Sequence, residues 1–176
     1  MLACLFLLLA IAVRFMPHPW GFTPVMGSLL FFGARSSRRF LWVPMALLVL
    51  CDLALTRYMW AYKFSWDQLL IWAWYAGVLW LGTRLHHNSR PLRIIGAALA
   101  GSVSFFLISN FGVWAATAMY SKDFSGLLAC YTLAIPFFRR TLEGDLFFTA
   151  VMFATPVLMR AIAGTFDRGR DRIAAA

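Results

Sequence analysis

The stretch TPVMGSLLFFGA, residues 23–34, sets the main constraint on the fold, because it is mostly apolar and yet only twelve residues long. A helix needs about 20 residues to cross the hydrocarbon core of a bilayer. Pro24 suits the first turn of a helix, and the basic cluster at 35–39 ends the apolar run. At membrane depth, such a short segment is tolerated only where other protein or a water-filled cavity covers it. We therefore predict a covered, broken or re-entrant helix at 23–34.

The composition of the whole chain is that of a membrane protein. Of the 176 residues, 62% are hydrophobic and 13% are charged, whereas soluble domains have about one half and one quarter. The length allows about five to seven helices of about 20 residues each, which leaves no room for a separate soluble catalytic domain. We expect a single integral-membrane domain over residues 1–176.

The apolar runs predict an all-α membrane protein with six transmembrane helices. The first run, 2–16, ends at Pro17 because residues before a proline avoid helical angles. It lacks the basic n-region and the small-residue cleavage site of a signal peptide, so we expect it to be retained as a helix. The other five helices are expected at 23–34, 40–56, 68–83, 94–119 and 146–163.

The segment between the last two of these helices, 121–145, is harder to assign. Gly126, Pro136 and Gly144 interrupt it, although the run 127–138 is apolar. These interruptions favour an extended loop that contains a short, partly inserted helix. The alternative is a seventh span.

Lysine and arginine are distributed unequally between the two sides of this arrangement, which predicts its orientation by the positive-inside rule. The net charge of +9 is therefore interpreted as topological and lipid-facing, and we expect no nucleic-acid binding. Both termini are expected to be cytoplasmic, in a multi-pass protein of the bacterial inner (cytoplasmic) membrane. The richer side carries Arg35, Arg38, Arg39, Arg84, Arg90, Arg93, Arg168, Arg170 and Arg172, and the other carries Arg57, Lys63, Lys122, Arg139 and Arg140.

Arg14 and Asp52 are the ionisable residues that fall most clearly inside predicted spans. A charge there costs several kcal/mol unless it is paired or faces a cavity. Both residues fall near the outer ends of their helices, so one reading is a mutual structural ion pair that closes the outward half of the bundle. In the other reading, Arg14 extends to the lipid headgroups and Asp52 caps the backbone of a neighbouring helix.

Two further segments carry candidate substrate-binding residues. In the motif SNFGVW at 109–114, Asn110 would donate a hydrogen bond to a ligand and Trp114 would stack on it. The alternative is that Asn110 bridges two helices. In the run 126–145, Tyr131 and Arg139 would reach the same ligand. The alternative there is an interfacial collar with Arg140, in which Glu143 and Asp145 cap a helix start.

Other features have simpler expected roles. Small residues between 96 and 104 predict a close helix-packing seam, within the protein or with a partner. No enzyme motif is present: the chain has no glycine-rich phosphate loop, no HExxH and no GxSxG. We therefore expect no enzyme activity and no cofactor. We also expect no metal site, because Cys4, Cys51 and Cys130 lack metal-ligand spacing. An interfacial aromatic belt is predicted from Trp60, Tyr62, Trp66, Trp72, Trp74 and Tyr75.

The motifs FTPV at 22–25, LLFFGA at 29–34, Asp52, SNFGVW and the run 126–145 resemble an uncharacterised bacterial integral-membrane family of the domain-of-unknown-function type. The resemblance covers nearly the whole chain. That family is similar in layout to the substrate-binding S components of energy-coupling-factor vitamin transporters. The similarity implies an S-component-like bundle of six helices, with both termini inside and a pocket at the outer face.

This resemblance implies capture of a small organic solute, such as a vitamin or its precursor, for uptake. A coupling transmembrane subunit with its ATPases is then an expected partner. Ala10 and Ala12 lack the Ala-x-x-x-Ala spacing typical of that docking, so a solitary transporter or another coupling surface stays open. The rival expectation is a structural or assembly subunit of a larger membrane complex. The expected pocket comprises Asn110, Trp114, Tyr131, Arg139 and Asp145, with Trp20 and Phe22 as a cover.

Overall fold

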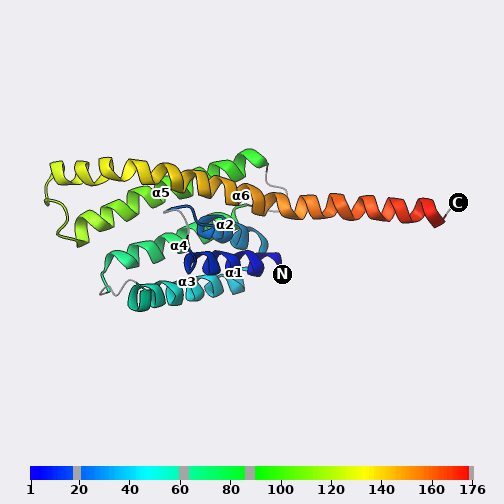
Figure 1. Cartoon of the computed structure of the whole chain (residues 1–176), viewed down its shortest axis with the longest axis horizontal. Coiled ribbons are helices and arrows are strands. Elements are labelled where there is room, and N and C mark those ends of the chain that lie inside the picture. Colours follow the sequence, from blue (N-terminus) through cyan, green and yellow to red (C-terminus); the bar gives the residue numbers. More distant parts are fainter. Residues whose placement is uncertain (18–20, 60–63, 86–89, 175–176) are drawn as a thin grey trace.

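The computed structural model describes residues 1–17, 21–59, 64–85 and 90–174, all of whose regular elements are helical. Figure 1 shows the helices aligned side by side in one bundle. A short 3-10 turn, Arg38–Phe40, precedes the third helix and a π-helical turn, Leu55–Met59, follows it. The α-helices are α1 (Leu2–Arg14), α2 (Val25–Arg35), α3 (Trp42–Ala54), α4 (Asp67–Thr83), α5 (Pro91–Ala116) and α6 (Phe124–Ala174).

The short helix α2 is the centre of the bundle. It packs against α1, α4, α5 and α6, and its residues from Val25 to Gly33 are all buried. Eleven residues extend only about 16 Å, so α2 has too little length to cross a bilayer in contact with lipid. The expectation that protein covers this segment is confirmed, and the helix is continuous.

Glycines on two sides of α2 allow its neighbours to approach at backbone distance. A Cβ atom on Gly82 of α4 would lie 2.6 Å from the Leu30 carbonyl oxygen, and one on Gly33 would overlap the carbonyl of Leu79. On the side of α6, a Cβ on Gly27 would lie 3.0 Å from the Thr149 backbone nitrogen. Small residues therefore set the helix spacing in the core.

Part of the predicted small-residue seam of α5 packs within the chain, whereas Gly96 and Ala100 are exposed. Ala97, Ala98 and Gly101 are buried, and a Cβ on Gly101 would lie 3.1 Å from the Met26 sulfur of α2. Gly96, in contrast, has open space where a Cβ would lie. The seam thus joins α5 to the central helix.

The loop predicted at 121–145 is wrong from residue 124 onward, because α6 is one helix of 51 residues that passes through Pro136 and Pro156. Asp123 caps its start by accepting a 2.7 Å hydrogen bond from the Gly126 N–H. This bond, with those from Ser125 and Ser121, lowers the pKa of Asp123. The two glycines reflect close packing: a Cβ on Gly126 would overlap the Ser121 carbonyl oxygen, and Gly144 lies under Phe22.

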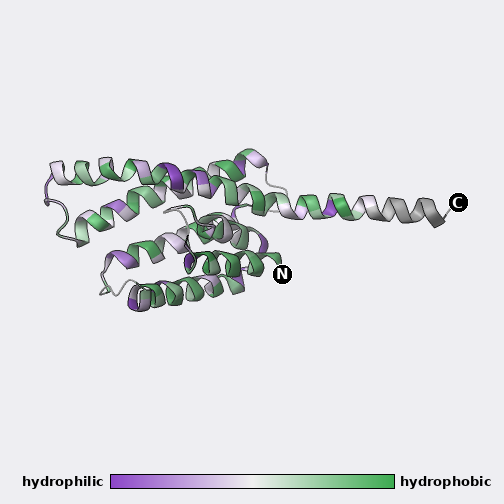
Figure 2. Cartoon of the chain, viewed as in Figure 1, coloured by the Kyte–Doolittle hydropathy of each residue, from purple (hydrophilic) through white to green (hydrophobic). Residues whose placement is uncertain are grey.

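Apolar residues predominate along the helices (Figure 2), and many of their large apolar side chains are exposed, among them Trp42, Leu50 and Leu107, as expected for a membrane protein. Three helical segments of the described chain are long and apolar enough to cross a membrane: Arg38–Met59, Pro91–Ala116 and Phe124–Thr165. Helices α1 and α2 are apolar but shorter. The all-α membrane class is thus supported by three candidate spans, while six separate spans stay a prediction.

Figure 1 shows the N-terminus at the same end of the bundle as the projecting C-terminal part of α6. A surface hollow at this end is lined by residues from three elements, among them Met1, Arg35 and Pro156. The contact between Gly33 and Gly82 places the C-terminal end of α4 beside that of α2. The basic residues at 35–39, with Arg84, Arg90 and Arg93, therefore gather at the end that holds both termini.

Gly33→Ala is expected to destabilise the protein, because the added methyl group would overlap the Leu79 carbonyl oxygen and separate α2 from α4. We expect the free energy of unfolding to fall by about 1–3 kcal/mol, as in overpacked cores. The measurement is denaturant unfolding of the detergent-purified protein. Gly77→Ala in α4 is the control, since a methyl group there meets nothing within 4 Å. Equal effects of the two substitutions would contradict this account of the contact.

Candidate functional site

A buried ion pair joins α1 to α3. Arg14 lies in the last turn of α1 and Asp52 near the end of α3. The Arg14 Nη2 atom is 2.5 Å from Asp52 Oδ1, and the two side chains are only 15% and 10% exposed. The structure thus brings together the two ionisable residues that the sequence predicted as partners.

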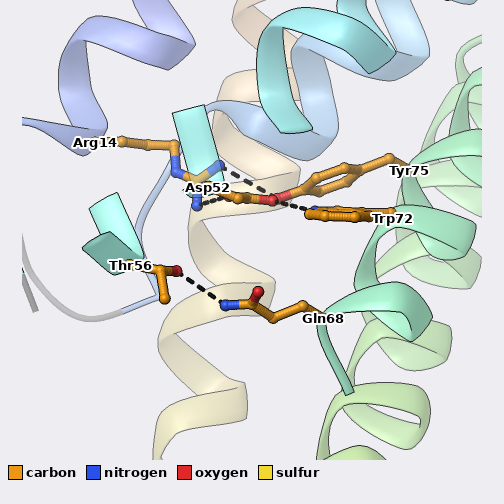
Figure 3. Close-up of polar contacts among 6 residues, drawn as sticks. All are labelled: Arg14, Asp52, Thr56, Gln68, Trp72 and Tyr75. Atoms are coloured by element: carbon orange, nitrogen blue, oxygen red, sulfur yellow. Dashed lines mark hydrogen bonds and ion pairs between the residues drawn. The ribbon is translucent and has the colours of Figure 1, made fainter. Parts of the chain in front are cut away.

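Helix α4 completes this cluster with two aromatic side chains (Figure 3). Arg14 Nη1 donates a 3.2 Å hydrogen bond to the Tyr75 hydroxyl, which lies 3.5 Å from Asp52 Oδ1. The Trp72 indole N–H donates to Asp52 Oδ2 at 2.9 Å. Both carboxylate oxygens of Asp52 are therefore engaged, as a buried charge requires.

The expected aromatic belt does not hold for Trp74 and Tyr75, which are 7% and 4% exposed. Trp74 donates its indole N–H to the Ser104 hydroxyl at 3.0 Å. The spacing of Trp72 and Tyr75, three residues apart, is the signal that places both on one helix face toward Asp52. Trp66 is partly exposed, whereas Trp60 and Tyr62 lie outside the described residues.

Two buried polar atoms that lack partners among the described residues lie at the start of α4, before Trp72 in the chain. The π-helical turn that follows α3 carries Thr56, whose hydroxyl accepts a 2.9 Å hydrogen bond from Gln68 Nε2 (Figure 3). In the described part of the chain, the buried oxygens Gln68 Oε1 and Asp67 Oδ1 have no hydrogen-bond partner. These two acceptors can receive hydrogen bonds from a donor that enters the bundle.

A second buried carboxyl, Asp145, lies on α6 and is 3% exposed. The Ser102 hydroxyl of α5 lies 2.6 Å from Asp145 Oδ2. Phe22, in the segment before α2, covers the preceding residue, Gly144, and its ring packs against those of Phe147 and Phe148. Phe22 thus packs on the residue that precedes Asp145 in α6.

The other expected pocket residues bond to nearby backbone. Asn110 donates to the Phe106 carbonyl of its own helix at 2.7 Å, and Trp114 donates to the Ser121 carbonyl at 2.9 Å. Tyr131 of α6 donates to the Leu107 carbonyl of α5 at 2.7 Å. Of these three bonds, that of Tyr131 joins α6 to α5, whereas that of Asn110 stays within α5 and does not bridge two helices.

Arg139 faces away from the bundle. Its side chain is 83% exposed and pairs with Glu143 one turn later, with 3.0 Å between Arg139 Nε and Glu143 Oε1. The structure does not bring Arg139 to the other expected pocket residues, and Trp20 lies outside the described residues. No three His, Cys, Asp or Glu side chains gather as a metal site in the described ranges.

Comparison with known proteins gives a family and no function. The model of a family described as "Family of unknown function (DUF6580)" matches residues 1–165. No curated protein and no solved structure matches the chain. The expected membership of an uncharacterised family is confirmed, while the likeness to S components finds no support in these comparisons.

Breaking the buried pair is expected to be costly, because each single substitution leaves one charge without its partner. Arg14→Met and Asp52→Asn should each lower the free energy of unfolding by about 3 kcal/mol or more. The double variant should recover much of this loss, since neither charge then remains. Unfolding of the four proteins in detergent gives the coupling energy.

The exposed pair Arg139 and Glu143 is the control for this cycle. Arg139→Met with Glu143→Gln should change stability by about 0.5 kcal/mol at most, because water and ions screen an exposed pair. Additive losses in the Arg14 and Asp52 cycle would contradict a coupled ion pair.

Proposed function

We propose that this chain, which belongs to the family of unknown function DUF6580, binds a small organic solute inside the helical bundle for transfer across the membrane. The family description gives no activity, so the proposal rests on the residues of the chain. The observation that carries this proposal is the buried Arg14–Asp52 pair. Ionisable side chains inside membrane spans are costly, and they characteristically mark substrate and ion pathways.

The chemistry of this cluster favours a solute with a carboxylate and a nearby hydrogen-bond donor. The Arg14 guanidinium matches a carboxylate in shape and charge. In the fold described here, Asp52 occupies that position as an internal substitute for the solute. Asp67 Oδ1 and Gln68 Oε1 are the acceptors that a hydroxyl, amide or ammonium of the solute would satisfy.

A solute can separate Asp52 from Arg14 only if it binds the open state of the site more tightly than the closed state. A solute with equal affinity for both states would not shift the equilibrium between them. The π-helical turn Leu55–Met59 begins three residues after Asp52. Such turns frequently accompany functional sites in helices. A change from π to α geometry in this turn would alter the register of the segment beside Asp52.

The direction of transfer that we propose is inward, from the outer face of a bacterial inner membrane. Basic residues gather at the bundle end that holds both termini (Figure 1), which supports a cytoplasmic position for that end. Arg14 ends α1 on the opposite half. This arrangement supports a solute site that opens outward, as in the S-component-like layout expected from the resemblance.

A second candidate function is that of a structural or assembly subunit, which the projecting part of α6 favours (Figure 1). Val157, Leu158 and Ile162 on this part are 62%, 59% and 56% exposed. The same surface would serve the transporter as a contact for a coupling transmembrane subunit with its ATPases. In a transporter that acts alone, this surface of α6 would contact lipid.

The proposal predicts that a carboxylate-bearing vitamin or precursor raises the thermal stability of the purified protein. A ligand that binds only the folded state adds about 2.7 kcal/mol at a concentration 100 times its Kd. The screen compares each acid with its neutral analogue, such as nicotinate with nicotinamide and pantothenate with pantothenol. Uptake of a radiolabelled hit into proteoliposomes then tests transport.

Arg14→Lys is the diagnostic variant, because it keeps the charge facing Asp52 but loses the planar fork of the guanidinium. We expect it to abolish the stabilisation by the acid, and Arg93→Lys on the exposed start of α5 to leave it unchanged. Loss in the double variant Asn110→Ala with Arg139→Ala, but not in Arg14→Lys, would instead support the pocket expected from the sequence. A well-folded protein that no compound stabilises would favour the assembly subunit.

A further inference from the structure

The second buried carboxyl, Asp145, differs from Asp52 in having no cation. Among the described residues, the ion pairs are those of Arg14 with Asp52 and of Arg139 with Glu143. Asp145 is 3% exposed, and its recorded hydrogen bond is the one with the Ser102 hydroxyl. An ionised carboxylate in such surroundings carries a large desolvation cost, which a neutral carboxyl avoids.

The charged groups on the surrounding elements lie away from Asp145. Glu143 is nearest in sequence but points about 200° around the helix, where it pairs with Arg139. Arg140, five residues earlier, is exposed. The remaining groups are at least eight residues away along a helix from Asp145, from its partner Ser102, or from Gly27, which lies against Thr149. The full set of described titratable side chains on these elements is Arg35 on α2, Arg93 on α5, and Cys130, Tyr131, Arg139, Arg140, Glu143 and Arg160 on α6.

The hydrogen bonds of Ser102 fit a protonated partner. The Ser102 hydroxyl oxygen lies 2.6 Å from Asp145 Oδ2 and 3.1 Å from the Ala98 carbonyl oxygen. A hydroxyl has one proton to donate, so with an ionised Asp145 it serves only one of these acceptors at a time. With a protonated Asp145, the carboxyl donates to Ser102 and Ser102 donates to Ala98. Both short contacts are then hydrogen bonds.

Thr149 supplies an unused polar group at the same place. Its side-chain oxygen has no hydrogen-bond partner in the described part of the chain, and the residue is 2% exposed. It lies four residues after Asp145, on the same face of α6, against Gly27 of α2. A buried hydroxyl in this position is available to donate to the carboxylate when Asp145 loses its proton.

We infer that Asp145 is a proton-binding site, formed with Ser102 and Thr149 between α2, α5 and α6, and that its carboxyl is neutral in this fold. The 2.6 Å contact between the two oxygens leaves no space for a metal ion between them. Phe22 covers the adjoining Gly144. This inference does not depend on binding of a solute.

Infrared spectroscopy of the full-length protein in liposomes, without any solute, tests the inference. At neutral pH the wild type should show a protonated-carboxyl C=O band, above the amide I band, that shifts in D₂O. Asp145→Asn should lack this band, and Asp52→Asn should retain it. Ser102→Ala should move its frequency, because the carboxyl O–H loses its acceptor.

Identical neutral-pH spectra of the wild type and Asp145→Asn would overturn the inference. Disappearance of the wild-type band on addition of NaCl would also overturn it, because Asp145 would then be a sodium ligand. None of these readings depends on the Arg14 site, so failure here is separate from failure of the proposed function.

A second measurement needs no variant and covers the case in which Asp145→Asn does not fold. Dicyclohexylcarbodiimide adds to protonated carboxyl groups in apolar surroundings, and mass spectrometry of peptides locates the adduct. We expect labelling of Asp145 and none of Asp52 at neutral pH. Labelling of Asp52 without Asp145 would overturn the inference.

Discussion

The complete covering of α2 is the constraint on which the rest of the structure depends. A helix of eleven residues leaves its terminal backbone groups at a depth where lipid offers no hydrogen bonds. Four other helices therefore surround it, and they approach closely because Gly27, Gly33 and Gly82 carry no side chain at the crossings. The positions of Tyr75 and Asp145 follow from this arrangement, since α4 and α6 pack against α2. Asp52 lies on α3, which is held in turn by α1 and α4.

The two buried carboxyls show how one bundle supports two electrostatic environments. Asp52 has a guanidinium, an indole N–H and a phenol around it, which together replace the hydration of a full negative charge. Asp145 has a serine hydroxyl. The difference arises from the surrounding residues: α1 and α4 contribute Arg14, Trp72 and Tyr75 to one site, while α2 and α5 present mainly small and apolar residues to the other.

Local patterns in the sequence predicted the apolar helices and offered an ion pair of Arg14 with Asp52 as one of two alternatives, because an unpaired charge inside a span is costly. They did not predict Ser102 or Tyr75 as partners, since those contacts join helices far apart in the chain. The loop expected at 121–145 was inferred from Pro136 and two glycines. In the structure, the glycines serve packing against Ser121 and Phe22, and α6 continues through the proline.

The continuity of α6 connects the core of the bundle to its projecting C-terminal end through a single helix. The same helix holds Asp145 in the core and extends past Phe153, which packs against Phe31 of α2, to Ala174. About 21 residues beyond that contact correspond to roughly 31 Å of helix. A tilt of about 5° where α6 leaves the bundle displaces its far end by about 3 Å. A small change in the direction of α6 inside the bundle would therefore produce a larger displacement at its projecting end.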